Sequence, residues 1–225
     1  MKMFKRILLY LAGLFCIAVG INVSKLAGLG FSPVSSVPRA LEVVWGFSLG
    51  TMIMLVYCAL VLLQLIVLRK DFRWVNTLGV PVGIVFGSLV DFVGINPATA
   101  GHLMARLSLT QPATYFGSLA CLILSIGIIG FGVTLYLMPK LIPMPGEGLA
   151  EAISKKTGKA FGDCKTIVDV SLILIALILQ LLFLGGFSSF TGDKVVVREG
   201  TVLSAVLVGQ TVKFFRTKVF TKPIV

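Results

Sequence analysis

Two irregular stretches, GLGFSPVSSVP over residues 28–38 and PKLIPMPGEG over residues 139–148, decide how this chain is organised. Each is rich in glycine and proline, and each separates two long apolar runs. Proline is favoured just inside a helix start, because the N–H that it lacks would have no partner there in any case. The sequence therefore predicts a short helix from Pro33 to Trp45 and a second over residues 149–157.

The apolar runs on either side indicate that lipid is the solvent. The chain has 225 residues, of which 57% are hydrophobic and 13% charged, and its mean hydropathy is +1.02. A soluble domain carries roughly a quarter charged residues. Unbroken runs of about 20 apolar residues match the thickness of the hydrocarbon core and favour helices over a barrel. We expect six membrane spans, over residues 7–26, 48–68, 78–94, 114–138, 166–184 and 201–215.

Lysine and arginine predict how these spans are oriented. With the N-terminus in the cytoplasm, 15 of the 20 basic residues fall on the inner side, and the outer side holds Lys25, Arg39, Arg106, Lys194 and Arg198. Cytoplasmic loops carry such an excess of basic residues. The prediction is a multi-pass protein of the cell inner (plasma) membrane with both termini cytoplasmic. The net charge of +11 is thus a topology signal, and nucleic acid is not expected as a partner.

The chain also repeats itself. A shift of 112 positions aligns identical residues without a gap, namely Gly20 with Gly132, Pro33 with Pro145, Gly46 with Gly158 and Gly50 with Gly162. A shift of 122 sets residues 86–92 beside residues 208–214, which implies about ten extra residues near residues 185–198. The predicted units are a first repeat over residues 1–100, an outer linker over 101–113 and a second repeat over 114–225.

Three spans per repeat is an odd number, so the second repeat must start on the opposite side of the membrane from the first. The predicted fold class is therefore all-α membrane, with about six transmembrane helices arranged as two inverted three-helix repeats. Inverted repeats of this kind recur in secondary transporters.

The two short helices leave two interpretations open. A helix from Pro33 to Trp45 is about 20 Å long at 1.5 Å per residue, too short to span the bilayer. It either dips into the membrane and returns, or lies flat at the interface. If both short helices dip in from opposite faces, their N-termini meet near the midplane and present free N–H groups to a ligand.

Polar residues in and after these stretches form the candidate substrate site. The set is Ser32, Pro33, Ser35, Ser36, Arg39, Pro145, Gly146, Glu147, Asp163 and Asp169. The serines would hold an anionic group at the first short helix. Arg39 would meet a substrate carboxylate or else anchor its helix at the interface.

The carboxylates have alternatives of their own. Glu147, with Asp169 or Asp163, would hold a cationic group or a coupling proton, since ionisable residues inside a membrane are costly and usually functional. Glu147 would otherwise only complement its helix dipole. Asp169 would otherwise only pair with Lys165 four residues earlier.

These residues favour a transporter over an enzyme. His102 is the one histidine, so neither a histidine metal site nor a Ser-His pair can form, and no phosphate-binding loop is present. We expect no cofactor and no metal. The predicted function is a small secondary transporter that moves a small polar or zwitterionic solute by alternating access. The alternative is a non-transporting membrane partner or regulatory protein, and a homo-oligomer is left open.

Three segments resemble the YczE/YyaS/YitT group of bacterial membrane proteins. They are Gly28-Leu29-Gly30-Phe31-Ser32-Pro33, Gly46-Phe47-Ser48-Leu49-Gly50 and Pro145-Gly146-Glu147-Gly148. The resemblance implies a bacterial inner-membrane protein. Relatives of the YitT type often carry a soluble C-terminal domain, whereas this chain ends about ten residues after its last predicted span, which favours the shorter YczE-like branch.

Overall fold

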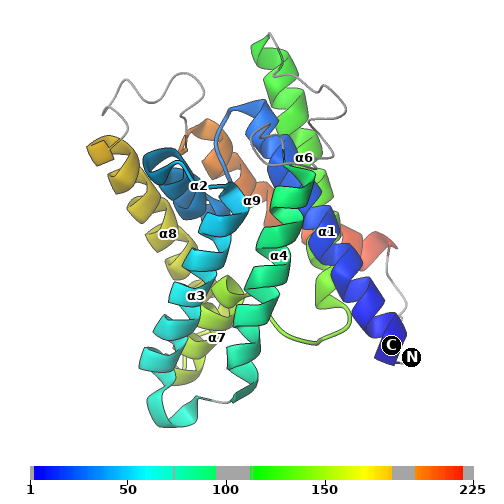
Figure 1. Ribbon diagram of the computed structural model, residues 1–225. Helices are drawn as coiled ribbons and strands as arrows, with labels where there is room; N and C mark the ends of the chain where they lie inside the picture. The colour runs from blue at the N-terminus through cyan, green and yellow to red at the C-terminus, as the bar shows by residue number, and fades with distance from the viewer. Residues whose placement is uncertain (1–2, 73, 95–111, 113, 184–195, 220–225) are drawn as a thin grey trace.

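The described part of the chain is helical and contains no strand. The computed structural model describes residues 3–72, 74–94, 112, 114–183 and 196–219 (Figure 1). Its long apolar helices are α1 (Met3–Ala27), α3 (Leu49–Leu68), α4 (Gly79–Val93), α6 (Tyr115–Leu137) and α8 (Phe161–Phe183). Short turns extend α3 through η1 (Arg69–Asp71) and precede α4 as η2 (Trp74–Leu78). With these turns, five helices are long and apolar enough to cross a membrane, as expected of a membrane protein.

Two predicted spans differ from the structure. The sixth corresponds to α9 (Glu199–Phe214), a helix of 16 residues that continues into a π-helical turn, η4 (Phe215–Val219), and is not among the five. The fifth was predicted to start at residue 166, which is wrong, because α8 begins at Phe161. Hydropathy misplaced this start, since the first turns of α8 carry the polar residues Asp163 and Lys165.

The two short helices form as predicted, and the second begins four residues earlier than expected. They are α2 (Pro33–Trp45) and α7 (Pro145–Thr157), each with a proline in its first turn. Each ends at a glycine with left-handed backbone, Gly46 with φ 74° and Gly158 with φ 72°, a conformation that residues with a Cβ rarely adopt. In Figure 1, α2 lies in the upper half of the molecule and α7 in the lower half.

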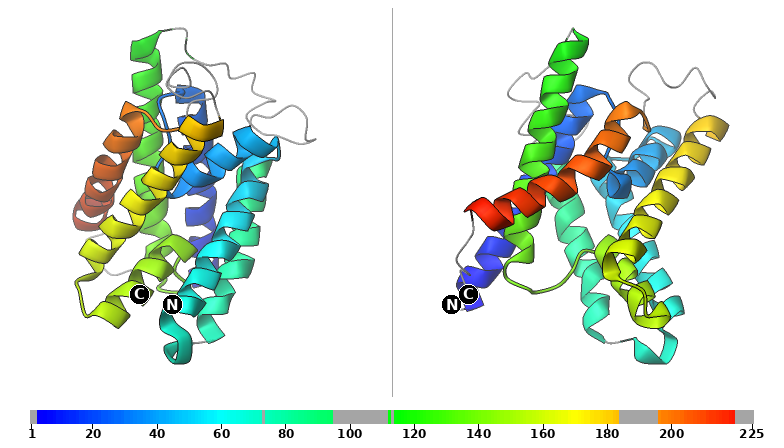
Figure 2. Two further views of the ribbon diagram at one scale, coloured as in Figure 1. Left: turned by 90° about the vertical axis from the view of Figure 1, so that its left-hand side faces the viewer. Right: turned by 180° about the vertical axis from the view of Figure 1, so that it is seen from behind.

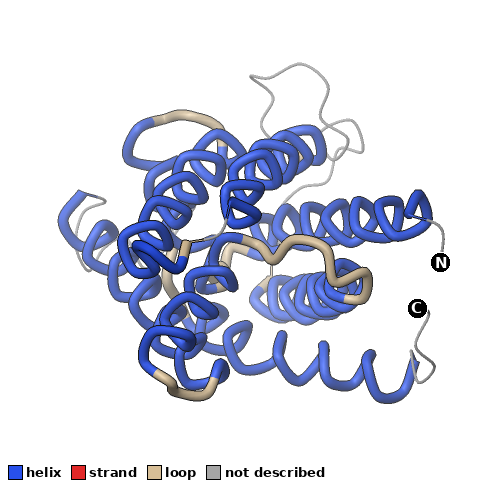
Figure 3. The backbone as a smooth tube through the Cα atoms, turned by 90° about the horizontal axis from the view of Figure 1, so that it is seen from below, coloured by secondary structure: helices blue, strands red, loops and turns tan. Residues whose placement is uncertain are grey.

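Helices α1 and α6 form one close pair. A Cβ placed on Gly13 would lie 2.5 Å from the backbone nitrogen of Tyr136, and one placed on Gly132 would lie 2.9 Å from the Cβ of Cys16. The two backbones therefore approach as closely as glycine allows. Where the chain between two helices is described throughout, as from α1 to α2 and from α7 to α8, the loop is short (Figure 3).

The short helices pack across the long ones. Helix α2 packs against α3 and α8, and α7 packs against α3 and α8 in turn. Helix α4 packs against α1 and α3, whereas α9 packs against α6. Within the described chain α8 and α9 do not pack against one another, and they diverge in the right-hand view of Figure 2.

Many exposed side chains of the long helices are large and apolar. Leu62 and Ile66 on α3, Phe116 on α6 and Leu182 on α8 are all at least 60% exposed. Such continuous apolar surface is typical of a face that lipid covers. The expected linker over residues 101–113, His102 and the extra residues near 185–198 fall largely outside the described residues.

Candidate functional site

The N-termini of α2 and α7 meet inside the molecule. A Cβ placed on Gly146 would lie 3.5 Å from both methyl groups of Val34, so the first turns of the two helices are in contact. Pro33 and Pro145 are buried, whereas Trp45 at the far end of α2 is 52% exposed. The two helices therefore approach each other by their N-termini, as the sequence predicts for the dipping arrangement.

A cavity of about 400 Å³ lies beside this contact. We call it the central cavity; every long helix, both short helices and α9 contribute to its lining. Six of the predicted site residues line it, namely Ser32, Pro33, Ser35, Gly146, Glu147 and Asp169. Residues of the two halves that are 111 to 137 positions apart in the chain are thus brought to one place.

Two other predicted residues lie near the helix starts but do not line the central cavity. The Ser36 hydroxyl is buried and donates to the Pro33 carbonyl oxygen at 2.7 Å, within its own helix. Pro145 borders a separate, smaller cavity, and its carbonyl oxygen accepts from the Gln64 side-chain amide at 3.0 Å. Both residues therefore stabilise the start of a short helix.

Arg39 and Asp163 lie apart from the central cavity. The Arg39 guanidinium donates to Glu42 at 2.6 Å and lies 5.5 Å from the ring centroid of Phe31. Asp163 is exposed in the first turn of α8. Neither residue lines the central cavity with the six named above.

Glu147 is a carboxyl group of the central cavity that belongs to no ion pair of the described residues. The Tyr136 hydroxyl donates to its carboxylate. The two other charged residues of the lining, Lys165 and Asp169, pair with each other. The alternative interpretation of Asp169, an ion pair with Lys165, is therefore seen in the structure, while both side chains still line the cavity.

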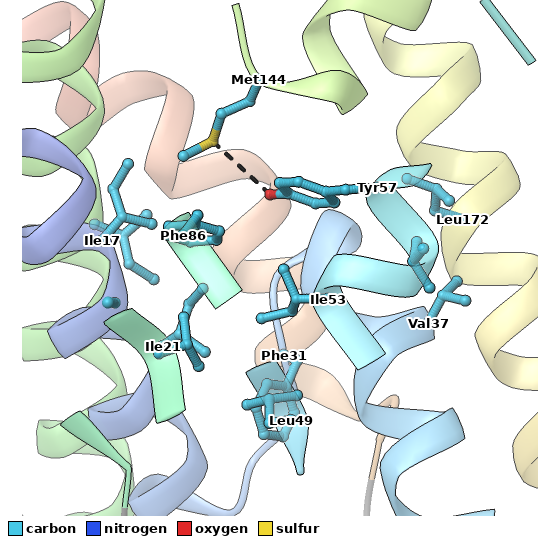
Figure 4. Close-up of a cluster of buried hydrophobic side chains, with 14 of the residues drawn as sticks. Ile17, Ile21, Phe31, Val37, Leu49, Ile53, Tyr57, Phe86, Met144 and Leu172 are labelled. Atoms are coloured by element: carbon cyan, nitrogen blue, oxygen red, sulfur yellow. Dashed lines mark hydrogen bonds between the residues drawn. The ribbon is translucent and has the colours of Figure 1, made fainter. Parts of the chain in front are cut away.

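The sequence did not point to the aromatic wall of the cavity. The rings of Tyr57 on α3 and Phe86 on α4 stack with centroids 5.9 Å apart and planes at 13°. The Tyr57 hydroxyl donates to the Met144 sulfur at 3.8 Å, which is a weak acceptor (Figure 4). Ile17 and Ile21 of α1 line the same cavity. Aromatic residues inside apolar spans carry no sequence signal that separates lining from packing.

The cavity is closed between α3 and α4. A Cβ on Gly87 would lie 2.5 Å from the Gly50 carbonyl oxygen, so the helices touch by their backbones. The Asp91 carboxylate accepts from the Ser48 hydroxyl at 2.6 Å and from the Gly50 N–H at 2.8 Å, and so holds the start of α3.

The cavity is bordered differently between α8 and α9. A Cβ on Gly162 or on Gly209 would meet no atom within 4 Å. Thr166 of α8 and Gly209 and Val212 of α9 line the central cavity instead of packing on each other. This side of the cavity lacks the backbone contact that closes the other.

Comparison with known proteins shows the family. A family model described as "Family of unknown function (DUF6198)" matches residues 4–217, and the chain belongs to this family. An uncharacterized protein of Haemophilus influenzae is 26% identical over 212 residues, which cover 94% of this chain and 84% of that protein. No solved structure matches the chain at a significant level. The resemblance to the YczE/YyaS/YitT group stays a prediction.

Proposed function

We propose that this protein is a small secondary transporter, which moves a small polar or charged solute across the cell inner membrane by alternating access. The central cavity would hold the solute, and two inverted repeats would exchange conformations around it. In this proposal α9 is the sixth span, both termini are cytoplasmic, and α2 and α7 are re-entrant helices that enter from opposite faces.

The helix boundaries support a duplication. Two helices of the second half begin 112 residues after their counterparts in the first: α7 and α8 begin at Pro145 and Phe161, and α2 and α3 at Pro33 and Leu49. The two short helices have 13 residues each and end at glycines related by the same shift. A shared origin explains this agreement more simply than two independent designs.

The contact between α1 and α6 supports the inverted relation of the halves. A Cβ on Gly20 would lie 2.5 Å from Ile129, and one on Gly132 would lie 2.9 Å from Ile17. The shift of 112 converts Gly20 into Gly132 and Ile17 into Ile129, so each contact is the image of the other. Two contacts that are exchanged by the repeat shift are expected where a two-fold axis relates the two halves.

The single observation that carries the proposal is the asymmetry around this axis. Gly50 and Gly87 bring α3 and α4 into backbone contact, whereas their counterparts under the shifts of 112 and 122, Gly162 and Gly209, have open space around them. One half is therefore closed and the other open. An exchange of the two arrangements would close the cytoplasmic side and open the outer side, which is alternating access.

Disulfide trapping tests this without a known solute. In a background in which the four native cysteines are replaced by serine, one variant carries S48C with D91C, whose native side chains are in contact between α3 and α4. Another carries A160C with K213C, their counterparts under the shifts of 112 and 122. Alternating access predicts that both pairs crosslink in membranes, because each half closes part of the time. A control that pairs G127C with G162C should not crosslink, since α6 and α8 are not among the helices that pack against each other.

The trapped proteins supply a second readout. With the 160–213 pair crosslinked, S35C should react with an impermeant thiol reagent from the outer side, and with the 48–91 pair crosslinked it should react from the cytoplasmic side. Crosslinking of the first pair alone, with unchanging access to Ser35, would contradict transport and favour a static membrane partner protein.

A further inference from the structure

We propose that the solute is a small organic cation with an apolar body, whose positive charge lies at Glu147 and whose body lies against Tyr57 and Phe86. The inference names the solute class of the proposed transporter. Transport of this cation rests on the proposed function, whereas binding of the cation does not.

The charges of the central cavity favour a cation. Lys165 and Asp169 neutralise each other, so the lining has one net negative charge when Glu147 is ionised. The hydrogen-bond partner of Glu147 is the neutral hydroxyl of Tyr136, and Lys165, the cation of the lining, acts on Glu147 only at a distance because it pairs with Asp169. A carboxylate removed from water is costly unless a positive charge or several donors compensate it. A cationic ligand supplies this compensation, and an anionic ligand would add to the cost.

The walls favour an organic cation over a metal ion. Ile17, Ile21, Ile129 and Val133 line the cavity together with the rings of Tyr57 and Phe86. A hard metal ion needs about six or more oxygen ligands, and the described residues hold no group of three or more His, Cys, Asp or Glu placed to bind one. Aromatic faces attract ammonium groups, and apolar walls accept hydrocarbon.

The size of the cavity agrees with this class. Its volume of about 400 Å³ lies within the range of sites that bind small organic molecules. The aromatic pair belongs to α3 and α4, the helices in backbone contact, whereas Glu147 belongs to α7. A ligand that contacts both therefore reaches from the closed half to the re-entrant helix of the other half.

Thermal unfolding of the purified full-length protein in detergent tests the charge class. The probes are benzyltrimethylammonium, benzyl alcohol and benzoate, which share a benzyl or phenyl ring and differ in charge. A ligand that binds only the folded protein raises the melting temperature as its concentration rises. We expect this rise with the ammonium and not with the alcohol or benzoate. An equal rise with benzoate or benzyl alcohol would overturn the proposal. Phenylalanine serves as a zwitterionic probe, and a rise with phenylalanine alone would overturn the proposal and indicate a zwitterionic solute.

Variants place the site. Glu147→Gln should weaken binding of benzyltrimethylammonium by about tenfold or more, since it removes the charged partner. Glu151→Gln, on the exposed side of the same helix, should leave binding unchanged. Phe86→Leu should weaken it by about three- to thirtyfold through loss of the ring. Unchanged binding in Glu147→Gln would refute the assignment. If Glu147→Gln does not fold, unchanged binding in Phe86→Leu would refute it.

Failure of this inference and failure of the transport proposal give different results. Binding of the ammonium without crosslinking at positions 160 and 213 would leave a cation site in a protein that does not alternate. Crosslinking of both cysteine pairs without ammonium binding would leave a transporter of another solute.

Discussion

At the scale of single residues, small side chains set how closely the central helices approach. Gly13 and Gly132 allow the backbones of α1 and α6 to touch, and Gly20 receives the side chain of Ile129. Without a hydrophobic driving force between helices in lipid, such contacts rely on dispersion and close packing. The close approach of α1 and α6 therefore depends on the lack of a side chain at these glycines.

Gly13→Ala should destabilise the protein by about 1–3 kcal/mol, because its new methyl group would lie 2.5 Å from the backbone nitrogen of Tyr136. Gly127→Ala is the matched control, since a Cβ there meets no atom within 4 Å. The measurement is the apparent melting temperature of the two variants in the same detergent. Equal melting temperatures would show that α1 and α6 are packed less closely than described.

At the scale of elements, a buried charge cluster joins α2 to α1. Lys25 at the end of α1 donates to Glu42 at 2.6 Å, and Arg39 donates to the other oxygen of the same carboxylate at 2.6 Å. The side chain of Glu42 is only 9% exposed. One carboxylate thus compensates two cations, and it fixes α2 at the angle that brings its N-terminus to α7.

Glu42→Gln should cost about 3 kcal/mol or more, because it removes the buried carboxylate that Lys25 and Arg39 share. Glu151→Gln removes an exposed ion pair with Lys155 on α7, and should change stability by less than about 1 kcal/mol. Thermal unfolding of both variants measures the difference. A loss in Glu42→Gln no larger than in Glu151→Gln would refute the role of the cluster.

At the scale of the whole molecule, the two halves are alike in sequence and different in arrangement. Gly50 lies in a tight contact, and Gly162, its counterpart, lies in open space. A substitution at each position therefore reports on a different state of the protein.

Gly162→Val should leave the melting temperature within about 1 °C of the wild type, because the described arrangement has room for the side chain. It should nonetheless abolish uptake of radiolabelled benzyltrimethylammonium into proteoliposomes, because α8 could no longer close on α9. Gly127→Val, also in open space, should transport normally. Normal transport by Gly162→Val would mean that α8 and α9 do not close through this glycine.

Much of the fold is local in origin, and the sequence alone determined it. Apolar runs specify long helices because an unsatisfied backbone cannot cross lipid. The prolines at 33 and 145 and the glycines at 46 and 158 set the limits of the short helices, because proline fits a first helical turn and glycine tolerates left-handed backbone. These signals act within a few residues, so the limits of α2 could be read from the sequence, whereas the start of α7 was placed four residues too late.

Tertiary structure alone decided which side chains share the central cavity. Ser35 lines it, whereas Ser36 turns to its own helix, because successive residues point about 100° apart around a helix. Tyr57 and Phe86 meet there only because α3 and α4 touch. Neither hydropathy nor any sequence motif indicates that α8 and α9 are separated. Two halves related by sequence can pack in two arrangements, and the packing of the whole molecule selects between them.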